Sequence, residues 1–130
     1  MEAAAKTCLV VDDSDFDRKI VEGCVTKAGL SVITAKSGEE ALKLAKQKLP
    51  DCFLIDWEMP GMTGIELLKE LRAVPGAEEI PIVFCTSHEH PSFVGHAFVQ
   101  GATGYISKPI TVQKVEDTFE GLGLLRDGAA

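Results

Sequence analysis

At 130 residues and 13.9 kDa, the chain has the size of one domain and is long enough to bury most of the surface that its unfolded form exposes. Its net charge of -7 excludes general binding to nucleic acid, whose phosphates would repel it. No apolar run approaches the ~20 residues that a membrane span requires, and residues 1–6 lack the features of a signal peptide, so we expect a cytoplasmic protein without membrane contact.

The first predicted strand, residues 8–11, is continuously apolar and ends at a pair of aspartates. A helix follows from Ser14 or Asp15, either of which can cap it, to about Ala28, and Gly29 is a suitable stop. Apolar residues recur at every fourth position of this helix, which predicts one buried stripe. The stripe consists of Phe16, Ile20, Cys24 and Ala28.

The rest of the chain continues the alternation of strands and helices. Further strands are predicted over residues 31–35, 52–55, 82–85 and 105–107. Further helices are predicted over residues 37–48, 65–73, 91–100 and from 111 onward. Ser37 and Glu40 have the spacing of a capping box, and Gly121 and Gly123 should fray the end of the last helix. This order predicts a doubly wound α/β fold with right-handed crossovers.

Four of the apolar runs close on residues that can handle phosphate or a metal ion. These residues are Asp12 and Asp13, Asp56, Thr86 and Lys108. Continuous apolar runs suit the strands of a parallel sheet that is buried on both faces. Because the carboxyl ends of parallel strands meet at one edge, where ligands bind in open α/β sheets, we expect these side chains to converge there.

The residue types at this edge favour phosphoryl transfer. Three carboxylates repel one another, and burial would raise the pKa of at least one of them unless a cation compensates. Asp12, Asp13 and Asp56, with a backbone carbonyl and waters, suit Mg²⁺. One carboxylate can then attack phosphorus while Lys108 holds the phosphoryl oxygens and Thr86 donates its hydroxyl.

These motifs, in this order and spacing, resemble the receiver domains of response regulators, of the stand-alone kind typified by the chemotaxis receiver. The matching segments are residues 10–13 with Arg18, 54–64, 86–87, 101–105 and 108–109. The resemblance covers about residues 6–125. It implies a (βα)5 fold with the flavodoxin-like strand order 2-1-3-4-5. It also implies a single receiver domain over residues 1–130, without an output domain.

The resemblance implies that Asp56 is the phosphoacceptor of a two-component phosphorelay. Its donor would be a histidine kinase or a phosphotransfer protein. Mg²⁺ would be bound by Asp12, Asp13, Asp56 and the backbone carbonyl of Glu58, with Asp13 a direct ligand. Lys108 would pair with the phosphoryl group. The protein would assist only its own phosphorylation and dephosphorylation and would otherwise not be an enzyme.

The resemblance also implies a switch that links phosphorylation to partner binding. Thr86 would move to bond the phosphoryl oxygen, and Tyr105 would rotate inward into the space that Thr86 leaves. The bond between Lys108 and Pro109 would be cis. A surface on the fourth helix, fifth strand and fifth helix would then be offered to a partner protein.

Other functions remain open at this stage. An aspartate-nucleophile phosphatase would want a second acid two residues after the nucleophile, which Glu58 matches in part, but the chain has no cap domain. A nucleotide- or flavin-binding protein would want a GxGxxG or GK[ST] motif, and the chain has neither. A receiver that works unphosphorylated as an interaction module is disfavoured by the complete set of site residues.

Several residues have two interpretations. Glu58 is either a solvent-facing carboxylate or one that repels phosphate and competes for Mg²⁺. His88 can influence the attack of water, whereas no fixed helical spacing brings it together with His90 and His96 as a metal site. The apolar surplus of residues 92–99 favours a partner-binding patch. The four cysteines form no CxxC pair and are best read as reduced core thiols.

Overall fold

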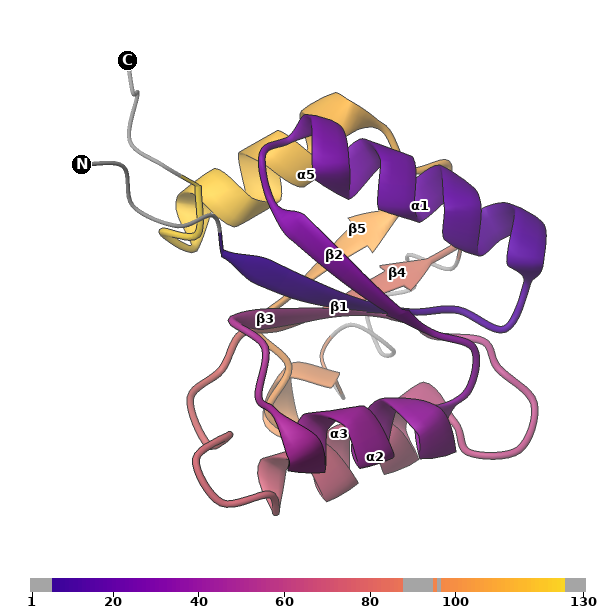
Figure 1. Cartoon of the computed structure of the whole chain (residues 1–130), viewed down its shortest axis with the longest axis vertical. Coiled ribbons are helices and arrows are strands. Elements are labelled where there is room, and N and C mark those ends of the chain that lie inside the picture. The colour runs from indigo at the N-terminus through magenta and orange to yellow at the C-terminus, as the bar shows by residue number, and fades with distance from the viewer. Residues whose placement is uncertain (1–5, 88–94, 96, 126–130) are drawn as a thin grey trace.

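The computed structural model describes residues 6–87, 95 and 97–125, and its strands form one parallel sheet in the order β2-β1-β3-β4-β5 (Figure 1). The strands are Thr7–Val11 (β1), Ser31–Ala35 (β2), Cys52–Asp56 (β3), Ile82–Thr86 (β4) and Gly104–Ser107 (β5). Every neighbouring pair is parallel. The predicted doubly wound fold and the strand order implied by the resemblance are both confirmed.

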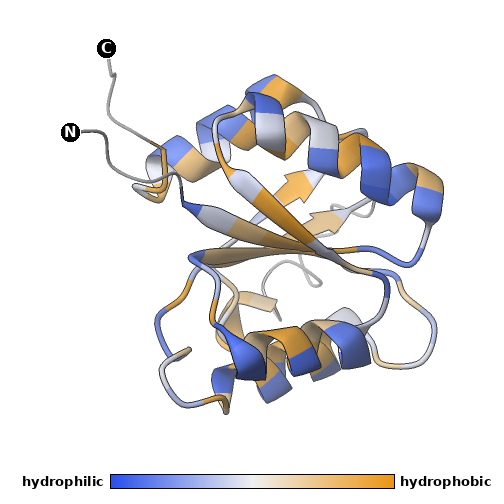
Figure 2. Ribbon diagram, in the orientation of Figure 1, coloured by the Kyte–Doolittle hydropathy of each residue, from blue (hydrophilic) through white to orange (hydrophobic). Residues whose placement is uncertain are grey.

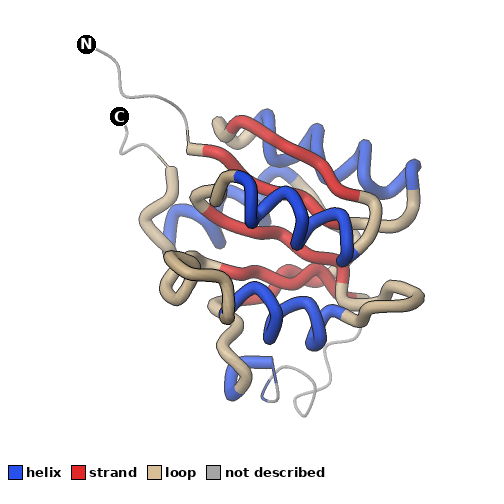
Figure 3. The backbone as a smooth tube through the Cα atoms, turned by 60° about the horizontal axis from the view of Figure 1, so that its bottom comes forward, coloured by secondary structure: helices blue, strands red, loops and turns tan. Residues whose placement is uncertain are grey.

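Helices cover both faces of the sheet, which lies between them in Figures 1 and 3. On one face lie α1 (Asp15–Lys27) and α5 (Val112–Gly121), and on the other lie α2 (Gly38–Gln47) and α3 (Gly64–Arg72). Of the helix predicted between β4 and β5, residues 95 and 97–99 are helical, and residues 91–94 and 96 lie outside the described part of the chain. No helix of the described residues is long and apolar enough to cross a bilayer.

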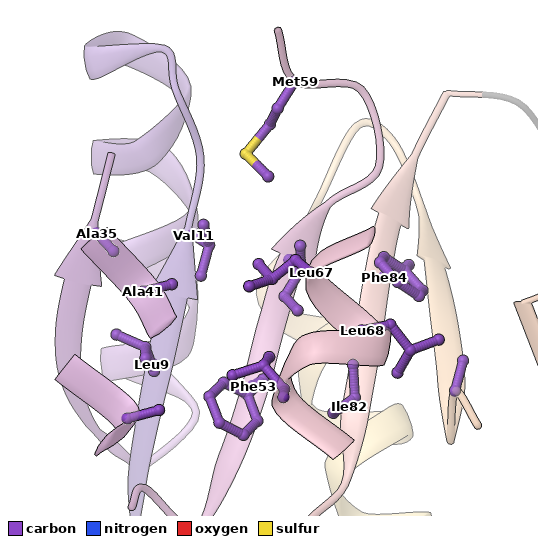
Figure 4. Packing of buried hydrophobic residues seen from close by; sticks show 14 of the residues in the cluster. Leu9, Val11, Ala35, Ala41, Phe53, Met59, Leu67, Leu68, Ile82 and Phe84 are labelled. Carbon is purple, nitrogen blue, oxygen red and sulfur yellow. The ribbon is translucent and has the colours of Figure 1, made fainter. Parts of the chain in front are cut away.

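The central strands of the sheet are buried on both faces, as their continuous apolar runs predict. Every residue of β3 and β4 is buried. Figure 4 shows Leu67 and Leu68 of α3 over the sheet, in one apolar cluster with Phe53, Ile82 and Phe84. On the opposite face, Val115 and Phe119 of α5 pack with residues of β1, β3 and β4. Hydrophobic residues colour the strands and part of each helix, and hydrophilic residues cover the outer helix surfaces (Figure 2).

The predicted core thiols lie on the α1 and α5 face. Cys8, Cys52 and Cys85 are buried there, Cys24 of α1 is partly buried against them, and all four are free thiols. Buried cysteine behaves as a small apolar residue, so these side chains contribute to packing.

The α1 stripe predicted from the four-residue repeat is wrong at its N-terminal end. Val21 and Val25 are the buried residues of α1, whereas Phe16 is 74% exposed and Ile20 is 42% exposed. A helix has 3.6 residues per turn, so each four-residue step drifts by ~40° around the axis. The stripe therefore spirals, and only its C-terminal end, near Cys24 and Ala28, reaches the sheet.

The helices begin at capping residues, with one difference from the prediction. Ser37 accepts a hydrogen bond from the Glu40 N–H, but the carboxylate of Glu40 accepts from the Lys36 N–H at 2.7 Å, so the capping box is incomplete. A complete capping box, which the sequence analysis did not identify, joins Thr63 and Glu66 at the start of α3. It fixes the point where the loop after β3 enters its helix.

Candidate functional site

Polar side chains converge at the carboxyl edge of the sheet. Asp12 follows β1, Asp56 ends β3 and Thr86 ends β4. They are the buried polar residues of the described chain, with exposed fractions of 2%, 5% and 5%. Their burial at one edge, among apolar strands, marks this place as the candidate site.

The aspartates lie close enough to share one cation. One carboxylate oxygen from each of Asp12, Asp13 and Asp56 lies within 4.8 Å of the others. Lys108, in the loop after β5, places its ammonium 3.0 Å from Oδ1 of Asp56. The structure thus brings together the carboxylates and the ammonium that the sequence analysis selected.

The loop between β1 and α1 fixes Asp12. The Ser14 N–H donates a hydrogen bond to Oδ1 of Asp12 at 2.9 Å. The Arg18 guanidinium donates to the carbonyl of Asp12 at 2.9 Å and also pairs with Asp15. The sequence identified Arg18 only as part of a motif. In the structure, its hydrogen bond to the Asp12 carbonyl restrains the loop between β1 and α1.

Burial and like charge make the carboxylates hard to ionise together. Burial raises the pKa of Asp12 from 3.8 to about 6, the hydrogen bond from Ser14 partly offsets this, and the charge of Asp56 adds to it. Burial also raises the pKa of Asp56, although the hydrogen bond and charge of Lys108 act in the opposite direction. The positive charge of Lys108 is therefore not enough to bring the pKa values of Asp12 and Asp56 back to their ordinary range.

The loop after β3 is fixed over the site by packing and backbone contacts. The ring of Trp57 packs edge-on against Phe84 with a centroid distance of 4.9 Å. A Cβ on Gly64 would lie 2.9 Å from the Phe84 ring and 3.3 Å from the Trp57 carbonyl, so only glycine fits at this place. The loop is therefore tied closely to β4.

Glu58 links two loops at the rim of the site. Its N–H donates to Oδ1 of Asp56 at 3.4 Å, and its exposed carboxylate accepts a hydrogen bond from the Ser87 hydroxyl at 3.4 Å. These contacts place Glu58 beside Asp56 and tie it to the end of β4.

The two proposed switch residues occupy neighbouring strands. Thr86 pairs in register with Ser107 of β5, and Tyr105 pairs with Phe84 of β4. Side chains two residues apart point to the same face of a strand, so Tyr105 lies diagonally from Thr86. Thr86 is buried, whereas Tyr105 is 40% exposed.

The described end of the helix before β5 carries exposed apolar side chains. Phe98 is 45% exposed and Val99 is 82% exposed. Within the predicted patch of residues 92–99, Gly95 is exposed and Ala97 is buried, whereas residues 92–94 and 96 lie outside the described part of the chain, as do His88 and His90. A hollow of about 340 Å³ adjoins Tyr105. It is lined by Tyr105, Ile106, Ser107, Lys114, Asp117 and Thr118.

A second hollow, of about 410 Å³, opens beside the carboxylates. Asp12, Cys85 and Lys108 contribute to its wall together with Ile20 and Val21 of α1. It lies between α1 and the loop after β5.

The sequence analysis missed Lys114 in the first turn of α5. The ammonium of Lys114 donates hydrogen bonds to the residues on both sides of Lys108. A basic residue shortly after the Lys-Pro motif, at the start of a helix, was the available signal. The bond between Lys108 and Pro109 is cis, as the resemblance implies.

The family of the chain follows from comparison with known proteins. The sequence profile of the response regulator receiver domain family matches residues 8–120. The chain belongs to this family, and with its parallel sheet and acidic carboxyl edge it is a receiver domain of two-component signalling.

The chain is similar to chemotaxis receivers in both sequence and structure. A CheY homologue of Campylobacter jejuni is 37% identical over 114 residues, which cover 86% of this chain and 88% of that protein. The structure of the chemotaxis protein CheY4 of Vibrio cholerae has a TM-score of 0.86 at 33% identity, covering 91% of this chain and 98% of that chain. These matches confirm the predicted resemblance to chemotaxis receivers.

Receiver domains also occur within longer regulators. The DNA-binding transcriptional regulator NtrC of Klebsiella pneumoniae is 36% identical over 105 residues, which cover 81% of this chain and 22% of that protein. The chain thus spans about a fifth of the length of this relative, and the similarity concerns the receiver part alone.

Proposed function

We propose that the protein is a response regulator of a cytoplasmic two-component phosphorelay. Asp56 accepts a phosphoryl group from the phosphohistidine of a kinase or phosphotransfer protein, and the phosphorylated form binds a protein partner. One observation carries this proposal. The buried carboxylate of Asp56 lies 3.0 Å from the ammonium of Lys108 and shares one potential cation site with Asp12 and Asp13.

The donor set fits Mg²⁺, which receiver domains bind as a family. The three carboxylates offer oxygen ligands, which hard divalent cations prefer. Burial raises the pKa of Asp12 and of Asp56, so a cation placed among them would relieve an unfavourable charge distribution. Asp12, Asp13, Asp56 and the backbone carbonyl of Glu58 would hold the ion. Bound there, it would neutralise charge on the phosphoryl oxygens.

The residues of the site divide the work of the transfer. A carboxylate oxygen of Asp56 attacks phosphorus, and an O–P bond forms as the N–P bond of phosphohistidine breaks. The imidazole leaves with the electron pair and takes up a proton as needed from solvent. Lys108 stabilises the negative charge of the phosphoryl oxygens, and Thr86 donates its hydroxyl to one of them. The chain also assists the later hydrolysis of the aspartyl phosphate, in which water attacks phosphorus, the bond to the Asp56 carboxylate breaks and inorganic phosphate is released.

The output of the phosphorylated form is binding through the surface around β5. Thr86 and Tyr105 lie diagonally on neighbouring strands, so a movement of Thr86 toward the phosphoryl group opens space beside Tyr105. The exposed side chains of Phe98, Val99 and Tyr105 supply apolar contact area for the partner.

The test is mass spectrometry of the intact protein after incubation with acetyl phosphate and Mg²⁺. We expect one added phosphoryl group in the wild type and none in Asp56→Asn. Asp117→Asn, an exposed aspartate of α5, is the matched control and should be labelled normally. Hydrolysis of many phosphoester molecules per protein would favour an aspartate-nucleophile phosphatase instead. Absence of labelling with every donor would favour a receiver that works unphosphorylated.

A further inference from the structure

Lys114 of α5 uses its ammonium to hold the loop that carries Lys108. It donates hydrogen bonds to the carbonyl of Ser107 at 3.0 Å, to the hydroxyl of Ser107 at 3.3 Å and to the carbonyl of Pro109 at 3.0 Å. An ammonium has three N–H groups, so these three contacts can use all of them. The acceptors belong to the two residues that flank Lys108.

Lys108 is thereby fixed from two elements. Its backbone N–H donates to the carbonyl of Thr86 at 2.8 Å, which ties it to the end of β4. The flanking carbonyls are tied to α5 through Lys114. From this fixed backbone the side chain reaches Oδ1 of Asp56 at 3.0 Å. A lysine side chain is a long and flexible stem, so the position of its ammonium depends on how well its backbone is held.

The helix that carries Lys114 is itself firmly anchored. Val115 and Phe119 have exposed fractions of 0%, and Thr111 caps the helix by accepting the Lys114 N–H at 3.1 Å. Lys114 therefore projects from the first turn of a helix that is packed into the core. Among the described residues no carboxylate forms an ion pair with it, which favours a positional role over a surface charge role.

We propose that Lys114 is a positioning residue for phosphoryl transfer, which keeps the ammonium of Lys108 at Asp56 by holding residues 107 and 109. This inference rests on the proposed function, because it assigns Lys114 a part in the same reaction. The role is indirect, since Lys114 contacts the loop and not Asp56.

The first experiment measures the rate at which acetyl phosphate and Mg²⁺ label Asp56. Lys114→Met keeps the length of the stem and removes the donors, and we expect labelling to slow about tenfold as Lys108 loses its orientation. Lys114→Arg restores donors and should recover most of the rate. Lys43→Met is the matched control, because Lys43 is an exposed lysine of α2 for which no hydrogen bond is found among the described residues, and its rate should equal that of the wild type.

A combination of substitutions separates positioning from general damage. If Lys114 acts through Lys108, then Lys114→Met should slow labelling no further in a Lys108→Met background. An equal additional loss in that background would overturn the proposal. A rate in Lys114→Met equal to that of the wild type would overturn it as well.

Amide hydrogen exchange supplies a readout that does not depend on phosphorylation. The Lys108 N–H should exchange faster in Lys114→Met than in the wild type, because its loop is less restrained. Unchanged exchange would contradict the proposal. If Lys114→Met fails to fold, Lys114→Leu, which also lacks donors, is measured in its place with the same expectations. If the wild type accepts no phosphoryl group, but the Lys108 N–H exchanges faster in Lys114→Met, the proposed function is overturned. The restraint of the loop by Lys114 is then still established.

Discussion

The ammonium of Lys108 lies 3.0 Å from Oδ1 of Asp56, yet the pKa of Asp56 remains above its ordinary value. Burial of Asp56 outweighs the hydrogen bond and charge of Lys108. The pKa of Lys108 is also raised, because the hydrogen bond and charge of Asp56, with the charge of Asp12, together outweigh the effect of its own burial. One ammonium thus compensates only part of the negative charge at this edge.

Lys108→Met should destabilise the metal-free protein. The substitution leaves Asp12, Asp13 and Asp56 without their nearby cation. Because the Lys108 side chain is 27% exposed, solvent softens this loss, and we expect about 1–3 kcal/mol. Urea unfolding without metal measures it, with Lys43→Met as the control. A midpoint equal to that of the wild type would contradict the proposed compensation.

The stability of the metal-free protein should fall as the pH rises from acid to neutral. The pKa of Asp12 is about 6 in the folded chain and 3.8 as its ordinary value, so between these values the folded chain holds the extra proton. Stability therefore falls as the pH rises, because the unfolded chain ionises first, and the fall is complete once Asp12 has also ionised in the folded chain. The raised pKa of Asp56 acts in the same direction. From Asp12 alone we expect a loss of about 1 kcal/mol between about pH 5.5 and about pH 7.5.

Asp12→Asn is the variant that tests this assignment. It removes the titrating group, keeps an oxygen that can accept from the Ser14 N–H, and should flatten the dependence on pH. Urea unfolding at both pH values measures the effect, and Asp117→Asn should retain the slope of the wild type. If the stability of Asp12→Asn depends on pH as strongly as that of the wild type, groups other than Asp12 cause the dependence.

Mg²⁺ should raise the melting temperature of the wild type. A ligand that binds only the folded chain stabilises it by about 2.7 kcal/mol at a concentration 100 times its Kd. Asp13→Asn removes the exposed member of the acidic cluster and should reduce the shift. Scanning calorimetry with KCl at matched ionic strength separates binding from screening. An unchanged melting temperature at saturating Mg²⁺ would rule out the site as drawn.

Only Cys24 should react readily with a thiol reagent in the native protein. Burial raises the pKa of Cys85 to about 12, and a hydrogen bond with Cys52 together with burial raises that of Cys8. Thiolates are the reactive form, so these groups should be inert until the chain unfolds. A colorimetric disulfide reagent, with and without denaturant, counts the thiols. Rapid reaction of Cys24→Ser before unfolding would show that a buried thiol is accessible.

The sequence predicted the fold well because its strands carry two kinds of information. Four of the strands contain short apolar runs that end at a polar residue, so both the parallel sheet and its functional edge could be inferred before the structure. The acidic cluster of Asp12, Asp13 and Asp56 follows from this geometry alone.

The errors and omissions concern contacts that periodicity does not encode. Phe16 and Ile20 share a spacing with Cys24, but the docking angle of α1 decides which part of a spiralling stripe meets the sheet. Glu40 has the right spacing for a capping box, but its carboxylate accepts from the Lys36 N–H and not from the Ser37 N–H. The position of Lys114 shortly after the Lys-Pro motif was a signal, but the path of the loop before α5 decides which oxygens its ammonium meets.

Lys114 borders two places at once, since the side chain that restrains the loop before α5 also lines the hollow beside Tyr105. A ligand in this hollow that bound the Lys114 ammonium would weaken its hydrogen bonds to the loop that carries Lys108. Stronger hydrogen bonds to that loop would in turn leave the ammonium less available to the ligand. By thermodynamic linkage, the free energy of binding at the hollow and the free energy of the contacts that hold the Lys108 loop would be coupled through a single amine.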